Sequence, residues 1–305
     1  MRPVLCIAGP TASGKSALAV ALAQAVGGEV INADALQVYS DIRVLSARPD
    51  PHEMQAVPHH LFGHVDGVAT SYSAGDWLRD AVPVIQDILA RGNVPVVVGG
   101  TGLYFKALLE GLAPVPPVPP AVLAEVEAMP VAELRQEAER IDPVSAARAL
   151  GEDPQRLARI VAVARSSGRP LSDWQAATRP VVPEGQTHRA VLLPERVALY
   201  SRIDARFDAM MDRGALQEAR AVHRRAYSAR ASLPKAIGLS HLLSYLDGEC
   251  DLAQAVETAK RDSRRLAKRQ STWFRNQCAD WEVLVTEADR EAWMRRMRHE
   301  LCRAG

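Results

Sequence analysis

The stretch VLCIAGPTASGKS, residues 4–16, decides the fold. Its first five residues are apolar and end at a glycine-proline turn, which predicts a buried strand over 4–8. The remainder matches the spacing Gly-(x4)-Gly-Lys-Ser, in which the glycines let successive backbone N–H groups surround a phosphate. We expect a phosphate loop, with the last hydroxyl binding Mg²⁺, formed by Gly9, Pro10, Thr11, Ala12, Ser13, Gly14, Lys15 and Ser16.

The residues after this loop alternate between helical and strand patterns. An Ala/Leu-rich helix is expected to end at Val26, and a strand is expected over 29–34. A helix capped by Asp76 should follow to about residue 90, and the apolar run 94–98 predicts another buried strand. This alternation predicts an α/β fold, a P-loop NTPase-like parallel sheet flanked by helices.

The sequence pattern changes after residue 113, where a proline-rich segment begins. Five prolines lie between 114 and 120, which predicts a stiff connector, and residues 121–178 have a helical pattern throughout. Strand patterns return at 189–193 and 281–285, within an otherwise helical remainder. We therefore expect a first part of the P-loop core over 1–113, an all-helical insertion over 114–180, and a return to the core with C-terminal basic helices over 181–305.

The acid that usually follows a Walker B strand is missing. The apolar run 94–98 continues into Gly99-Gly100-Thr101-Gly102, which contains no carboxylate. The expected strand 29–34 does end in an acid, Asp34, at the edge of the sheet where ligands bind. Asp34 could hold a metal, accept a proton or merely cap a turn, and Thr101 is expected to line the same crevice.

The composition excludes several classes of protein. Hydrophobic residues make up 48% and charged residues 24%, which is typical of a globular chain with a full core. No apolar run approaches the 18 residues or so of a membrane span, and the N-terminal run is too short for a signal peptide. The four cysteines are far apart in sequence, which favours reduced thiols in a cytoplasmic protein over disulfides or a zinc site.

Positive charge is concentrated in one segment, although the net charge is only +1. Residues 1–110 carry a balance of −3 and residues 111–305 a balance of +4. Between 260 and 275 there are seven basic residues and one acid, and a helix would place most of the basic ones on one broad face. Such a face suits the phosphates of a nucleic acid, and a merely solvated surface is the alternative.

Seven blocks together resemble a known family, the tRNA dimethylallyltransferases, which are also called tRNA isopentenyltransferases. The blocks occur in the family's order over nearly the whole chain, and their number makes the resemblance far more specific than the loop alone. They are GPTASGKS at 9–16, DALQVY at 34–39, PHHL at 58–61, YSA at 72–74, GGTGLY at 99–104, DPQRLAR at 153–159 and KRQSTWFR at 268–275.

The resemblance implies transfer of a dimethylallyl group from dimethylallyl diphosphate to N6 of the adenosine 3′-adjacent to the anticodon in tRNA. It implies Asp34 as the base that accepts the N6 proton, Thr101 beside the reacting centre, and Mg²⁺ bound by Ser16. We expect a monomer, although the sequence does not determine the oligomeric state. Residues 11–16 would hold the diphosphate, and Gln37 would read the base. The implied contacts to the tRNA anticodon arm are Asp34, Ala35, Leu36, Gln37, Thr101, Gln155, Arg156, Leu157, Ala158, Arg159, Lys268, Arg269, Gln270 and Arg275.

Three departures from the family pattern concern tRNA contacts. Ala35 replaces a usual serine, Leu123 a frequent basic residue, and Leu239 a usual tyrosine. Three other functions stay open. An adenylate isopentenyltransferase shares the loop and the acid but needs no basic helix. A P-loop nucleotide kinase needs lid arginines, and a non-catalytic RNA-binding module would not need Lys15, Ser16 and Asp34 intact.

Overall fold

A computed structural model describes residues 2–68, 72–149, 151, 153–228 and 231–303. The chain divides into two compact units, one made of residues 1–107 and 182–305 and the other of residues 108–181. The sequence pattern put the helical insertion at 114–180. Within the described residues, no helix is both long and apolar enough to cross a membrane.

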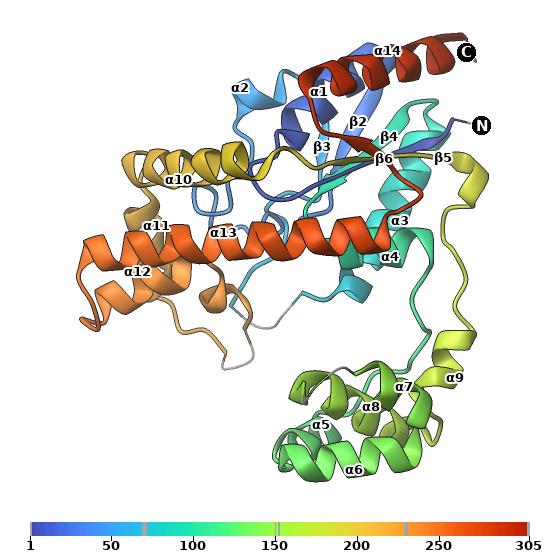
Figure 1. Ribbon diagram of the computed structural model, residues 1–305, viewed down its shortest axis with the longest axis vertical. Coiled ribbons are helices and arrows are strands. Elements are labelled where there is room, and N and C mark those ends of the chain that lie inside the picture. Colours follow the sequence, from blue (N-terminus) through green and yellow to red (C-terminus); the bar gives the residue numbers. More distant parts are fainter. Residues whose placement is uncertain (1, 69–71, 150, 152, 229–230, 304–305) are drawn as a thin grey trace. The chain divides into compact units, whose positions relative to one another are not determined.

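A six-stranded sheet forms the centre of the larger unit (Figure 1). All its strand pairs are parallel, and the order is β3-β2-β4-β1-β5-β6. The expected strand 29–34 ends earlier, at Asn32, so Asp34 lies in the loop beyond the strand. The strands are β1 (Val4–Ala8), β2 (Gly28–Asn32), β3 (His59–His60), β4 (Val94–Gly99), β5 (Thr187–Leu192) and β6 (Glu282–Leu284).

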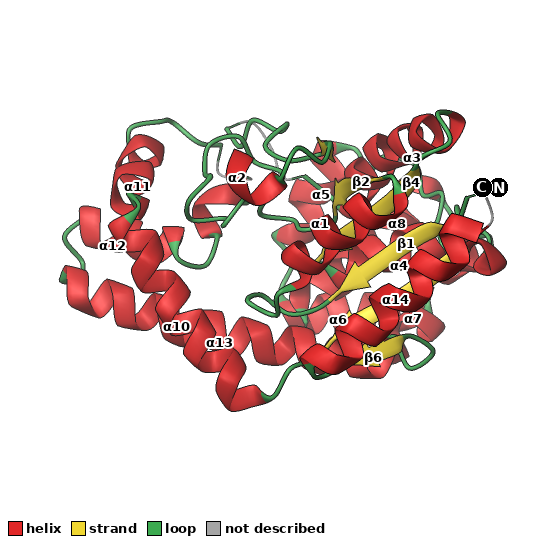
Figure 2. Ribbon diagram, turned by 90° about the horizontal axis from the view of Figure 1, so that it is seen from above, coloured by secondary structure: helices red, strands yellow, loops and turns green. Residues whose placement is uncertain are grey.

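Helices pack on both faces of the sheet (Figure 2). Inward residues such as Leu5 and Val96 share a core with Leu22 and Trp293, which are contributed by helices α1 and α14. Helix α3 packs on β4 and buries Trp77 completely. The helices of this unit are α1 (Lys15–Val26), α2 (Pro51–Met54), α3 (Ala74–Ala90), α4 (Gly102–Leu109, which reaches the second unit), α10 (Arg196–Asp212), α11 (Ala215–His223), α12 (Leu239–Leu246), α13 (Leu252–Gln277) and α14 (Glu287–Arg303).

The cap of α3 differs from the expected one. Ser73 is the N-cap residue, and its hydroxyl accepts a hydrogen bond from the backbone N–H of Asp76. Asp76 is the third helical residue, and its carboxylate accepts from the backbone N–H of Ser73. The prediction of Asp76 as the cap was therefore wrong by one turn, because the two residues form a reciprocal capping box.

The end of β4 lies unusually close to the end of β2. The N–H of Ala33 donates to the carbonyl of Val98 at 2.7 Å, and the N–H of Thr101 donates to the carbonyl of Ala33 at 3.2 Å. A Cβ on Gly99 would lie 1.9 Å from that same carbonyl oxygen, so only glycine fits there. The glycine that stands in place of a Walker B acid therefore brings the segments of Thr101 and Asp34 together.

The second unit consists of helices and loops, with no strand among its described residues. The proline-rich segment near its start has no regular secondary structure over residues 111–119. Its core contains Leu134, Leu157 and Val161, and the N–H of Val181 donates to the carbonyl of Leu108 at 3.2 Å. Its helices are α5 (Pro120–Glu127), α6 (Val131–Ile141), α7 (Pro143–Arg148), α8 (Pro154–Ser167) and α9 (Leu171–Ala176).

Candidate functional site

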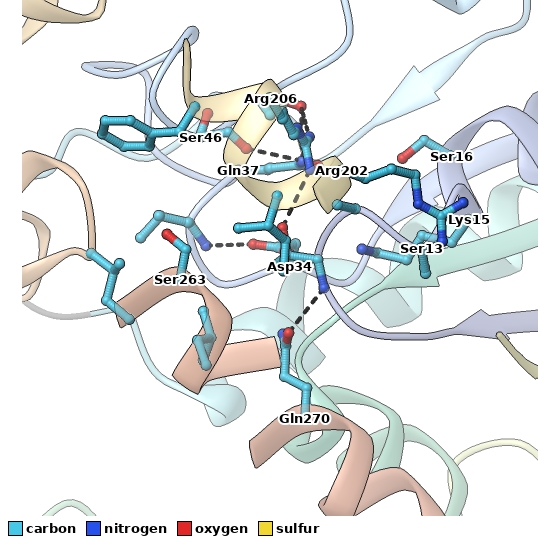
Figure 3. Close-up of a pocket in the computed structure, with 18 of the residues that line it drawn as sticks. Ser13, Lys15, Ser16, Asp34, Gln37, Ser46, Arg202, Arg206, Ser263 and Gln270 are labelled. Atoms are coloured by element: carbon cyan, nitrogen blue, oxygen red, sulfur yellow. Dashed lines mark hydrogen bonds between the residues drawn. The ribbon is translucent and has the colours of Figure 1, made fainter. Parts of the chain in front are cut away.

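A pocket of about 590 Å³ opens at the carboxyl edge of the sheet (Figure 3). The phosphate loop from Thr11 onward forms one wall, and the turn after β2, from Asp34 to Gln37, forms another. Helices α10 and α13 contribute further lining, together with residues 45–47, Glu53, Thr101 and Ile237. The sequence prediction that the loop, Asp34 and Thr101 share one crevice agrees with this lining, which includes Thr101.

The loop presents a lysine and the start of a helix to the pocket. Lys15 is the first residue of α1 and is 8% exposed, and its Nζ donates to the carbonyl of Pro10 at 3.3 Å. Burial lowers the pKa of Lys15 to about 8, and the neighbouring Asp34 carboxylate offsets part of that shift. Ser16 is exposed beside it. A helix N-terminus with a cation favours an anionic ligand.

Gly9 and Pro10 belong to the loop but do not line the pocket. Gly9 is needed for a close approach, because a Cβ there would lie 2.9 Å from the carbonyl oxygen of Leu192 on β5. Both residues are buried and carry the chain from β1 into the loop. Their contribution is therefore to the shape of the loop.

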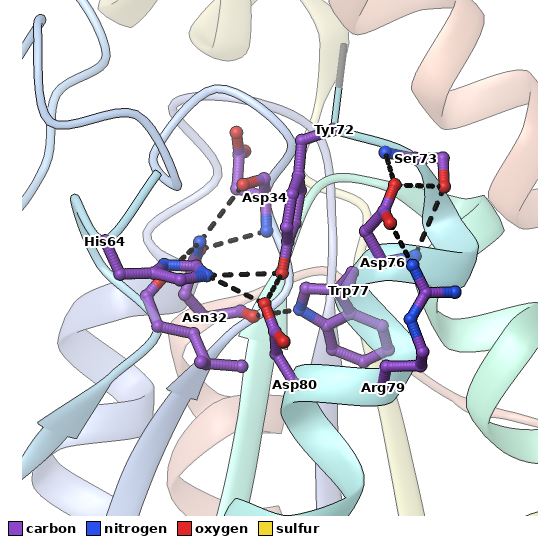
Figure 4. Close-up of polar contacts among 10 residues, drawn as sticks. Asn32, Asp34, His64, Tyr72, Ser73, Asp76, Trp77, Arg79 and Asp80 are labelled. Atoms are coloured by element: carbon purple, nitrogen blue, oxygen red, sulfur yellow. Dashed lines mark hydrogen bonds and ion pairs between the residues drawn. The ribbon is translucent and has the colours of Figure 1, made fainter. Parts of the chain in front are cut away.

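Asp34 is fixed by a neighbouring asparagine (Figure 4). The fully buried Asn32 accepts from the backbone N–H of Asp34 at 2.9 Å and donates to its carbonyl at 3.1 Å. The indole N–H of Trp77 donates to the carbonyl of Asn32 at 2.7 Å. The Oδ1 atom of Asp34 accepts from the N–H of Leu36, whereas no donor among the described residues reaches Oδ2. One carboxylate oxygen therefore caps the turn and the other is available.

Thr101 and Gln37 have partners that restrict what they can do. The Thr101 hydroxyl accepts from the backbone N–H of Ala35 at 2.9 Å, which holds the two edges of the pocket together. The amide nitrogen of Gln37 donates to the carbonyls of Ser46 and Ala47 at 3.2 and 3.1 Å. The amide nitrogen of Gln37 is therefore engaged within the protein, and its amide oxygen accepts no hydrogen bond from the described residues.

Two arginines of α10 were missed by the sequence analysis. Arg206 donates to the hydroxyl of Thr11 at 3.3 Å, and burial lowers the pKa of Arg206 while Asp34 offsets that effect. Arg202 lines the same pocket, one helical turn away. Their spacing of four residues indicates that they share one face of a helix. It does not indicate that this face meets the loop, which lies about 190 residues earlier in the chain. The remaining lining is largely apolar and comes from Leu45, Ile203, Phe207, Met210, Ile237 and Leu266.

Gln270 connects α13 with the phosphate loop. Its side-chain oxygen accepts from the backbone N–H of Thr11 at 3.0 Å, and its nitrogen donates to the carbonyl of Gly100 at 2.9 Å. The packing beside it is tight, because a Cβ on Gly102 would lie 2.2 Å from the ring of Trp273. The predicted contact residue Gln270 thus belongs to the wall of the pocket.

The basic segment of α13 is less basic than its sequence indicates. Lys260 pairs with Asp208 at 2.6 Å, Arg264 pairs with Asp204, and Arg261 and Arg265 pair with Asp262. The exposed cations without an ion pair among the described residues are Lys268, Arg269 and Arg275. Two of the seven basic residues are therefore paired with acids of α10, two share the single carboxylate of Asp262, and three have no ion pair among the described residues.

The predicted contact segment 155–159 lies on α8, in the helical unit. Gln155, Arg156 and Arg159 are exposed there. Leu157 and Ala158 are buried in the core of that unit, so their side chains are unavailable to a ligand. The substituted position Leu123 also packs against this core, whereas Leu239 is fully buried in the larger unit.

The sheet and the loop at its centre define a P-loop protein of the α/β class. A family model described as IPP transferase matches residues 37–277 of the chain. The chain belongs to this family and is a transferase enzyme.

Curated relatives and solved structures agree with the family assignment. The chain is 49% identical to the tRNA dimethylallyltransferase of Maricaulis maris, over 94% of each chain. It is 48% identical to that of a Bradyrhizobium strain, over 92% and 93% of the two chains. A tRNA isopentenylpyrophosphate transferase from Bacillus halodurans superposes with a TM-score of 0.71 at 31% identity, over 100% and 99%. A eukaryotic dimethylallyltransferase acting on tRNA gives 0.81 at 27% identity, over 93% of this chain and 74% of that one.

Proposed function

We propose that the protein transfers a dimethylallyl group from dimethylallyl diphosphate to N6 of the adenosine 3′-adjacent to the anticodon in tRNA. The observation that carries this proposal is the shared pocket. A phosphate loop, a carboxylate with one available oxygen and a patch of apolar side chains face one space. These are the three surfaces that a prenyl diphosphate and an attacking amine require. The names of the relatives and solved structures support the same reaction.

The reaction forms a bond between N6 and C1 of the prenyl group and breaks the bond between C1 and the diphosphate oxygen. N6 gains positive character as it attacks, so it must release a proton. Asp34 Oδ2 is the acceptor that we assign, because Oδ1 is engaged by Leu36 and Asn32 fixes the turn. A base held in this way needs no reorganisation when the proton moves.

The leaving diphosphate gains negative charge as its bond to carbon breaks. Lys15, Arg206 and the N-terminal N–H groups of α1 would stabilise this charge in a partly water-excluded site. The apolar side chains from α10 and α13 would hold the five-carbon chain. The adenine must be splayed out of its stack to enter, and the amide oxygen of Gln37 can accept a hydrogen bond from a bound base.

Mg²⁺ fits the donors that the pocket offers. The Ser16 hydroxyl is an oxygen ligand of the kind that Mg²⁺ binds beside a diphosphate, and Asp34 supplies a carboxylate to the same pocket. The described residues contain no cluster of three or more His, Cys, Asp or Glu that could enclose a metal, so the substrate would complete the coordination. When bound, the ion would neutralise diphosphate charge.

Labelled dimethylallyl diphosphate would test this function directly. The purified full-length protein is incubated with it and Mg²⁺, together with either bulk tRNA or free AMP. We expect the label in tRNA, on the adenosine next to the anticodon. Label in AMP alone would identify an adenylate isopentenyltransferase, and label in neither acceptor would contradict prenyl transfer.

The affinity for dimethylallyl diphosphate should fall above about pH 8. The ligand requires protonated Lys15, whose pKa is lowered to about 8 by burial in the free protein. Below that pH the lysine is charged and the affinity is level, and above it each pH unit should cost up to roughly tenfold. Titration calorimetry from pH 7 to 9.5 measures this. Lys15→Arg, which stays charged, should flatten the profile, whereas a level profile in the wild type would assign the charge elsewhere.

The three free cations of α13 should set the salt dependence of tRNA binding. Replacing Lys268 and Arg269 by Ala should weaken binding and reduce the slope of log affinity against log salt by roughly one to two units. Lys260→Ala is the matched control on the same helix, because Asp208 already neutralises that lysine. The measurement is the tRNA dissociation constant at salt concentrations from about 50 to 200 mM, a range over which the slope is readily determined. Equal slopes in the double variant and the control would make this face a solvated surface.

A further inference from the structure

The C-terminal helix α14 places an arginine against the backbone of the phosphate loop at Ser13 and Gly14. Helix α14 packs on α1, and the side chain of Arg290 is only 13% exposed. Its Nη2 donates to the carbonyl oxygen of Ser13 at 3.2 Å, and its Nη1 would lie 3.2 Å from a Cβ built on Gly14. This helix lies beyond residue 277, where the match to the family model ends.

The contact engages the peptide group between Ser13 and Gly14. A trans peptide is planar, and its C=O and N–H point in opposite directions. Arg290 donates to the carbonyl of Ser13, so the N–H of Gly14 points away from Arg290. Gly14 lines the pocket, where an N–H donor can reach a phosphate oxygen.

The same side chain adds a charge behind the loop. A guanidinium stays protonated, and the ion-pair partner of Arg290, Glu287, is 72% exposed and therefore compensates it weakly. The Nε of Arg290 is buried without a hydrogen-bond partner among the described residues, which is a cost to folding. Arg290 is thus held at the loop by its hydrogen bond to Ser13, and its positive charge lies beside the loop with only a weak compensating partner.

We propose that Arg290 is a positioning residue for the diphosphate, which makes α14 part of the substrate site. It acts through the Ser13–Gly14 peptide and through its charge, without touching the ligand. This inference deepens the proposed function and rests on it for the identity of the diphosphate as dimethylallyl diphosphate.

The test compares Arg290→Gln with Arg290→Lys and with a matched control. Arg295→Gln is that control, because Arg295 lies on the same helix, pairs with Glu291 four residues earlier and is 71% exposed. For each full-length variant the readouts are the dissociation constants of inorganic pyrophosphate and of tRNA, the KM for each substrate, and the melting temperature.

We expect Arg290→Gln to weaken pyrophosphate binding and raise the KM for dimethylallyl diphosphate by roughly tenfold or more, the scale of one charge-assisted hydrogen bond. The tRNA affinity should stay unchanged, Arg290→Lys should recover part of the loss, and Arg295→Gln should behave as wild type.

Two results would overturn the inference. One is equal pyrophosphate affinity in Arg290→Gln and Arg295→Gln, and the other is an early-melting Arg290→Gln that loses both substrates equally. A wild type that binds pyrophosphate but transfers no prenyl group would defeat the proposed function alone, since pyrophosphate binding still tests Arg290.

Discussion

Asp34→Asn should lower the rate of prenyl transfer by about 10²–10⁴-fold, the range for loss of a general base. The asparagine keeps the size of the side chain and can still accept a hydrogen bond from Leu36 through its amide oxygen. Asn32 holds the backbone of the turn independently of the side chain at position 34. The change therefore removes the proton acceptor and leaves the pocket in place. Single-turnover rates with tRNA measure it.

The affinity for dimethylallyl diphosphate provides the control for this variant. It should change far less than the rate, because the phosphate loop supplies most of the diphosphate contacts. Turnover at the wild-type level would remove Asp34 from the mechanism and leave it as a turn cap. An equal loss of rate and of ligand affinity would assign Asp34 to holding the diphosphate through a metal ion.

The second large effect is expected for Lys15→Ala alone. Its turnover in prenyl transfer should fall by about 10²–10³-fold, and its affinity for the diphosphate should fall as well. Lys15 is the buried first residue of α1, and among the described residues no other lysine lines the pocket. The melting temperature and the tRNA affinity should stay near wild type, since the packing of α1 depends on its apolar residues. Rates at saturating dimethylallyl diphosphate separate the two effects.

The wild-type protein should show no RNA-stimulated hydrolysis of ATP. Gly99 stands where an ATPase carries its Walker B acid, and the contact with Ala33 leaves no room for any side chain there. Steady ATP turnover that depends on Lys15 would contradict this expectation and return a kinase or an ATPase to consideration.

Local patterns were sufficient to predict the centre of the fold. The buried strand 4–8 was confirmed, and the helix after the loop ends at Val26 as expected. The apolar run 94–98 is a strand that extends by one residue, to Gly99. These segments could be predicted because each is fixed by neighbours in the sequence, either an uninterrupted apolar run or a glycine stop.

The rest depends on contacts between distant residues. Arg206 reaches Thr11 and Arg290 reaches Ser13 across most of the chain, and no local pattern announces either contact. The partly neutralised face of α13 has the same cause, because two of its acidic partners, Asp204 and Asp208, lie on α10. The role of Asn32 in holding the backbone of Asp34 could not be predicted either, because it depends on the complete burial of Asn32 beside that turn.

The backbone hydrogen bond between Val181 and Leu108 has a consequence for how this architecture can vary. It brings the entry and exit of the helical unit side by side, so the whole segment leaves and rejoins the chain at almost one place. A segment of that kind can be lengthened, shortened or exchanged by evolution without altering a single strand pairing. The larger unit, which carries the pocket, and the helical unit of residues 108–181 can therefore change in sequence independently of each other.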